Sequence, residues 1–181
     1  MAASKRMIVP LVALAALAPA SAPAAPPSVR GAKAQPGARA LLVSKELWAT
    51  IDVCNPKDQP DTVGIRGSMP GDGQARDRMY MSFRLQYLER NTMRWLDLST
   101  GASTGFVSVG AGAAASRQDG GSFVIAPVAG RPAFTLRGVV DFQWRRGRKV
   151  LVSGERPTTV GRLSVSGADP AGYSAATCLI G

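Results

Sequence analysis

Histidine is absent from all 181 residues of the chain. This absence removes the commonest general base and the commonest metal ligand of proteins, so Ser–His–Asp and Cys–His catalysis are excluded and zinc lacks its usual ligands. Cysteine occurs only twice, at Cys54 and Cys178, which allows a single intramolecular disulfide. Lysine is also scarce, and none of the five lysines stands in the spacing that Ser–Lys catalysis uses.

Long apolar runs are missing too. The apolar stretch Met7–Leu17 has eleven residues, fewer than the roughly 20 that a membrane-spanning helix needs. It follows Lys5-Arg6 and precedes a run of small residues, the arrangement of a secretory signal peptide. We expect a signal over residues 1–22 with cleavage between residues 20 and 25, and its retention as an anchor stays open. The mature chain is expected to be secreted or extracytoplasmic, where a disulfide can form.

The rest of the chain divides into a leader and one domain. Residues 23–39 are mostly alanine, proline, glycine and basic residues without periodicity, which predicts a disordered leader. Residues 40–181 have the length of a single domain, and no internal repeat divides them. A domain of this size buries roughly two thirds of its unfolded surface, so the disulfide would reinforce an existing core.

Alternating apolar and polar residues recur through this domain. The alternation is clearest at Met79–Tyr87 and Phe134–Trp144. Further strands are expected at Glu46–Cys54, Thr62–Met69, Met93–Leu98, Phe106–Val109, Ser122–Ala126, Lys149–Ser153 and Tyr173–Ile180. The first of these places Leu47, Ala49, Ile51 and Val53 on one face and Trp48, Thr50, Asp52 and Cys54 on the other. Eight or nine short strands and little helix predict an all-β, two-layer antiparallel sandwich, with a small barrel as the competitor.

Several segments together resemble a set of uncharacterised secreted bacterial proteins. These segments are Glu46–Thr50 with Val53-Cys54, Gly64–Pro70, Phe142–Arg145, and Ala168–Pro170 with Tyr173–Cys178. The resemblance implies an immunoglobulin-like β-sandwich over nearly all of the mature domain, and it implies no activity. Trp48 precedes Cys54 on one strand, whereas antibody domains place the core tryptophan on the strand after the first cysteine. The likeness to immunoglobulin domains is therefore architectural.

Positive charge is in excess, at +10 for the whole chain and +8 once Lys5 and Arg6 leave with the signal. The densest cluster is a candidate anion-binding site made of Arg145, Arg146, Arg148 and Lys149. Its expected partner is an anionic envelope polymer or a protein, and specific nucleic-acid binding is not expected. The alternative is a solvated hairpin tip in a chain whose composition reflects a G+C-rich genome. Because the arginines are spread along the chain, the sequence favours diffuse attraction to polyanions.

Acidic residues supply the remaining chemistry. Four lie near expected strands and could form a glycoside-hydrolysing pair: Asp52, Glu89, Asp97 and Asp141. Two loops hold pairs that could contribute to a calcium site, Asp58 with Asp61 and Asp72 with Asp77. Pairing with arginine and turn formation are the favoured alternatives, because neither loop has EF-hand spacing.

The sequence thus assigns no catalytic, cofactor-binding or metal-binding residue. It predicts a secreted, disulfide-stapled β-sandwich that acts as a non-catalytic binding or structural module at the cell envelope or outside it. The alternative function is a carboxylate-based hydrolase acting on extracellular glycans.

Overall fold

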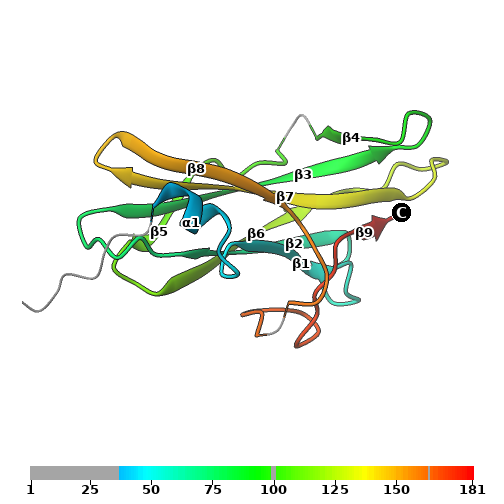
Figure 1. Cartoon of the computed structure of the whole chain (residues 1–181). Helices are drawn as coiled ribbons and strands as arrows, with labels where there is room; N and C mark the ends of the chain where they lie inside the picture. Colours follow the sequence, from blue (N-terminus) through cyan, green and yellow to red (C-terminus); the bar gives the residue numbers. More distant parts are fainter. Residues whose placement is uncertain (1–36, 99–100, 163) are drawn as a thin grey trace, which may run out of the picture. The chain divides into compact units, whose positions relative to one another are not determined.

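A computed structural model describes residues 37–98, 101–162 and 164–181. These residues form one short helix and nine strands (Figure 1). The helix is α1 (Ala38–Leu42), and the strands are β1 (Trp48–Cys54), β2 (Thr62–Pro70), β3 (Arg78–Glu89), β4 (Arg94–Asp97), β5 (Val107–Ala111), β6 (Ser116–Val124), β7 (Phe134–Arg146), β8 (Lys149–Pro157) and β9 (Cys178–Ile180). Within the described ranges, no helix combines the length and apolarity needed to cross a membrane. The expected signal peptide and the expected leader up to residue 36 lie outside these ranges, and the last leader residues Ala38 and Arg39 belong to α1.

All strand pairings between the named strands are antiparallel, and they build two sheets. One sheet has the order β1-β2-β6, and we call it the three-stranded sheet. The other follows the order β4-β3-β7-β8, with β5 also paired to β3 and β9 to β7. Figure 1 shows the two sheets as layers, the six-stranded one curled into a half-barrel. The predicted mostly-β, antiparallel class with eight or nine strands is confirmed, and so is the hairpin of β3 and β4.

The boundaries of three strands differ from the prediction. β6 begins at Ser116 rather than Ser122, because its polar and glycine residues pair along the whole length of β2 without showing an apolar alternation. β8 continues beyond Ser153 to Pro157, still paired with β7. Conversely, β9 begins only at Cys178, since the residues from Tyr173 onward make a single isolated bridge to β1.

The core lies between the sheets and follows the predicted alternation of β3 and β7. Met79, Met81, Phe83 and Leu85 of β3 are fully buried, as are the inward residues of β7, namely Leu136, Val140, Phe142 and Trp144. The three-stranded sheet contributes a smaller set, which includes Ala49, Ile51, Val63, Ile65, Met69 and Phe123. The indole Nε1 of Trp144 donates a hydrogen bond to the Pro70 carbonyl at 2.9 Å and so ties β7 to the end of β2.

A β-bulge at Asp52 changes which cysteine face is buried. Ile51 lies opposite Ile65, but Val53 lies opposite Gly64, so Asp52 is the extra residue of β1. A Cβ on Gly64 would stand 2.6 Å from the Asp52 carboxylate and 2.8 Å from the Val53 Cβ, which places both side chains on the outer face. The prediction that Val53 shares the face of Ile51 is therefore wrong.

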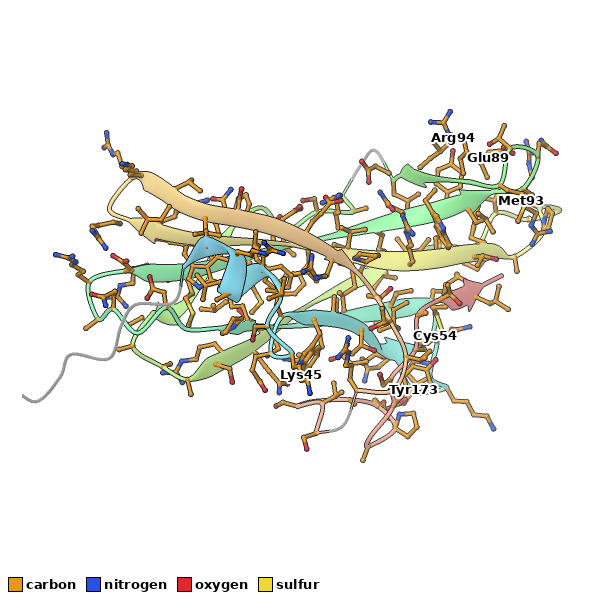
Figure 2. All side chains as sticks on the ribbon, in the orientation of Figure 1. Lys45, Cys54, Glu89, Met93, Arg94 and Tyr173 are labelled. Carbon is orange, nitrogen blue, oxygen red and sulfur yellow. A yellow bond between two sulfur atoms is a disulfide. The ribbon has the colours of Figure 1, made fainter. Side chains whose placement is uncertain are left out.

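Because of this bulge, Cys54 turns toward the core and reaches Cys178. The two cysteines form the predicted disulfide, which spans 124 residues of sequence and joins β1 of one sheet to β9 of the other (Figure 2). The bond is thus a cross-link between the two layers.

The segment between β8 and β9 covers the free edge and outer face of the three-stranded sheet (Figure 1). Its backbone donates from Thr159 to the Ala49 carbonyl at 2.9 Å and from Asp169 to the Asp52 carbonyl at 2.9 Å. Ala175 exchanges two backbone hydrogen bonds with Ile51. This cover explains why β1 is buried on both faces although it is an edge strand.

Only one of the three tryptophans fills the space between the sheets. Trp144 is fully buried there. Trp48 is buried outside that core, with the Arg162 guanidinium 5.8 Å from its ring. Trp95 lies half-buried on β4, with the Arg137 guanidinium 4.4 Å from its ring. The outer face of the six-stranded sheet therefore carries aromatic residues as well as charge.

Candidate anion-binding site

Strand geometry divides the predicted cluster of basic residues. Arg146 and Lys149 are the last paired residues of β7 and β8, and Gly147 and Arg148 form the turn between them. Gly147 has a positive φ of 57°, a conformation that glycine adopts without strain. Because successive side chains of a strand point to opposite faces, Arg145 and Arg146 leave β7 in opposite directions. The four predicted residues therefore do not face a single ligand.

Arg146 is committed to a buried carboxylate. Its Nε and Nη2 donate hydrogen bonds of 2.6 and 2.8 Å to the two carboxylate oxygens of Asp77, whose side chain is fully buried. These hydrogen bonds are the main reason why the pKa of Asp77 lies below its ordinary value. Beside it, burial raises the pKa of Asp72, and the neighbouring Asp77 adds to that rise. Arg146 thus serves the interior charge balance rather than a ligand.

Arg145 is held differently, by aromatic rings. Its guanidinium lies 4.2 Å from the ring centroid of Tyr80 and 4.7 Å from that of Phe106. Its Nε donates a hydrogen bond of 2.7 Å to the Gln143 side-chain oxygen. Among the described residues the ion pairs belong to other arginines, and none includes Arg145. The guanidinium is fixed in place, and its two terminal nitrogens remain for an oxyanion, which they can bind in a bidentate manner.

A second arginine faces Arg145 directly. Arg78, the first residue of β3, is the cross-strand partner of Arg145 in the β3–β7 ladder and is exposed. Like charges in this position destabilise a sheet, and a bound anion would relieve the repulsion. Arg148 and Lys149 are exposed at the adjoining turn, at the same end of the sheet as the start of β3 (Figure 1). We call Arg78, Arg145, Arg148 and Lys149 the cationic end.

The sequence missed Arg78 because it precedes the cluster by 67 positions. Only the register of β3 against β7 brings it beside Arg145. The two clearest apolar alternations were a usable signal that these strands pair, but alternation does not give the register.

A pocket of about 320 Å³ adjoins Arg145 on the outer face of the six-stranded sheet. Phe106 and Gln143, which both contact Arg145, also line this pocket. The other lining residues are Asp141, Phe142, Ser153, Gly154 and Glu155. We call it the Phe106 pocket; it combines an exposed aromatic ring with a hydroxyl, an amide and two carboxylates.

One guanidinium holds the carboxylates of this region. Arg84 donates to Asp141, to Glu155 at 3.0 Å and to Asp97 at 3.3 Å. Burial opposes the charge of Arg84, but the hydrogen bonds it donates to Asp141 and Glu155 outweigh burial and raise its pKa. Three carboxylates around one guanidinium leave this part of the face negative, next to a positive end.

The four candidate acids of a hydrolase fall in three places. Asp52 is buried on the outer face of the three-stranded sheet, where burial raises its pKa and a 2.9 Å hydrogen bond from Arg66 opposes that rise. Glu89 accepts hydrogen bonds from the backbone of the β3–β4 turn, close to Arg94 in Figure 2. Asp97 and Asp141 alone meet, through Arg84. The sequence missed Glu155, because the predicted strand ended at Ser153.

The candidate calcium loops have other contacts. The backbone nitrogen of Asp61 donates to the Asn55 side chain, within a turn where both residues have positive φ. Asp72 and Asp77 are buried, and Asp77 is bound by Arg146. In the part of the chain that the structure describes, no group of three or more potential ligands has the geometry to hold a metal ion.

Comparison of the chain with family models, with curated proteins and with solved structures finds no match. Function must therefore be argued from the geometry.

Proposed function

We propose that this chain is a secreted, non-catalytic binding module that holds an anionic polymer of the cell envelope at its cationic end. The observation that carries the proposal is the Arg145 guanidinium, which two aromatic rings and Gln143 fix in place without a carboxylate partner among the described residues. Such a group meets an oxyanion with little further loss of side-chain entropy. Arg78 beside it adds a charge whose repulsion only a ligand relieves.

This geometry favours a dedicated site over diffuse attraction. A solvated, mobile hairpin tip would need no aromatic support for one of its arginines. A diffuse field would also gain nothing from opposing Arg78 and Arg145 across two strands, since that arrangement costs stability.

Secretion and architecture complete the proposal. The signal-like start of the chain supports export, and export is compatible with the disulfide between Cys54 and Cys178. We further propose an immunoglobulin-like assignment of the strands. It is supported by the crossed order of the sheets, in which β2 pairs with β6 and β3 pairs with β7.

The test compares two triple variants of equal charge. Arg78→Gln/Arg145→Gln/Arg148→Gln neutralises the cationic end, and Arg94→Gln/Arg117→Gln/Arg131→Gln neutralises three exposed arginines elsewhere. Binding of polyphosphate is measured by titration calorimetry over a range of salt concentrations. We expect the first variant to lose most of the affinity and up to about 0.9 per lost contact in the slope of log K against log salt, and the control to lose little. Equal losses would refute the dedicated site.

Glycan hydrolysis remains as a second candidate because of one observation. Asp141 and Glu155 are cross-strand partners and both line the Phe106 pocket. Against it, each accepts a hydrogen bond from Arg84, so neither carboxyl stands free as the proton donor that glycoside hydrolysis needs. A screen of polysaccharides for new reducing ends decides the matter: turnover that Asp141→Asn and Glu155→Gln both abolish would replace the binding proposal.

A further inference from the structure

We infer that the ligand is an acidic polysaccharide, bound with its anionic group on Arg145 and one sugar ring in the Phe106 pocket. This inference rests on the proposed function and names the class of polymer. It is carried by the contact between the two sites, because Phe106 and Gln143 belong to both.

The charges of the two sites select a ligand with two chemically different parts. Arg145 and Arg78 require an anionic group. The pocket beside them contains Asp141 and Glu155, which share the single guanidinium of Arg84 with Asp97. A ligand that is anionic throughout would meet these carboxylates and be repelled. The part that enters the pocket must therefore be uncharged.

The lining of the pocket suits hydroxyl groups. Carboxylates are pure acceptors, and sugar hydroxyls are donors. Arg84 takes one oxygen of Asp141 and one of Glu155, and the hydrogen bonds among the described residues leave the other oxygen of each for a ligand. Arg84 also holds both carboxylates in position before binding, which lowers the entropic cost. Ser153 and Gln143 add a hydroxyl and an amide that can donate or accept.

The dimensions and the aromatic wall fit one sugar unit. A volume of about 320 Å³ is at the lower end of the range for ligand pockets, roughly 300–1,000 Å³. The Phe106 ring is 41% exposed, so it can pack against the apolar face of a ring while the hydroxyls point to the carboxylates. Ser153 and Glu155 lie at the exposed rim, which lets the polymer continue on either side.

The experiment separates the sugar from the charge by using two probes. Polygalacturonate carries one carboxylate on each sugar ring, and poly-glutamate carries one carboxylate per residue without a sugar. At about 150 mM salt, we expect the folded chain to bind polygalacturonate roughly tenfold more tightly than poly-glutamate. Ser153→Trp should fill the pocket from an exposed strand position and remove this preference while leaving the poly-glutamate affinity unchanged.

A matched pair of variants tests the carboxylates. Glu155→Gln alters the lining of the pocket, and Asp97→Asn alters a carboxylate that also pairs with Arg84 but does not line the pocket. We expect the first to weaken polygalacturonate binding and the second to leave it unchanged. Equal binding of the two polymers by the native chain would overturn the sugar inference and leave the proposed function intact. Failure of polygalacturonate, poly-glutamate and polyphosphate alike to bind would overturn both.

Discussion

Removing the disulfide should cost this fold several kcal/mol. The variant Cys54→Ala/Cys178→Ala keeps both positions apolar and opens a loop of 124 residues. In the chain-entropy model, closing a loop of that length stabilises the folded state by about 5 kcal/mol, and measured values for native disulfides run from about 2 to 5 kcal/mol. The stability of a typical domain is about 5–15 kcal/mol, so the loss would be a large share of the total.

The position of the bond supports the upper part of that range. It joins β1 of one sheet to β9 of the other, and Cys178 is 2% exposed. β9 has only three residues and pairs with β7 alone, so without the bond it is held by one short ladder.

Urea unfolding followed by tryptophan fluorescence measures the effect. The double variant should unfold at lower urea, with a larger dependence of the free energy on urea because its unfolded chain is less compact. An unchanged midpoint and slope would refute the reasoning, and so would alkylation of both cysteines in the exported native protein. Polyphosphate binding serves as the control, because Cys178 pairs with Leu136 at the end of β7 far from Arg145.

Two further predictions concern the core and acid stability. A Cβ at Gly138 would stand 2.7 Å from the Ile65 side chain, so Gly138→Val should overpack the core and lower the free energy of unfolding by about 1–3 kcal/mol, measured by urea unfolding. The pKa of Asp77 is lowered by Arg146 from an ordinary value of 3.8, so its carboxylate stabilises the fold above that pH and this contribution is lost as the pH falls through the lowered pKa. Unfolding measured from neutral pH to about pH 3 should show this acid-dependent loss in the native chain and less of it in Asp77→Asn. An identical pH dependence in the two proteins would contradict the Arg146 pairing.

The long central strands could be predicted because their two faces differ. In β3 and β7, apolar residues alternate with polar ones over nine or more positions, and the structure buries the apolar set. β6 lacked this signal, since its outward face is exposed and two glycines interrupt it. Its pairing with β2 is a tertiary property that local sequence does not express.

The site was half predictable for a similar reason. Arg145 and its neighbours stand together in the sequence, but Arg78, Tyr80 and Phe106 come from other strands or loops. The bulge at Asp52 was equally hidden, because a single extra residue in one strand is defined only against its partner.

Arg145 and Arg146 offer the sharpest test of the proposed site, since they are adjacent and carry the same charge. A diffuse electrostatic field treats them alike, and neutralising either should weaken polymer binding by a similar factor. The structure assigns them different partners: Arg145 contacts Tyr80 and Phe106 without a carboxylate, and Arg146 binds the buried Asp77.

Arg145→Gln should therefore reduce polyphosphate affinity strongly and change the unfolding midpoint little. Arg146→Gln should do the reverse, because it leaves the Asp77 carboxylate buried without its guanidinium partner. Its stability should partly recover as the pH falls toward about 4, where the buried carboxyls take up protons. Calorimetry and urea unfolding on the same two variants give both readouts. Similar binding losses for the two variants would show that net charge, and not the stacked guanidinium, attracts the polymer.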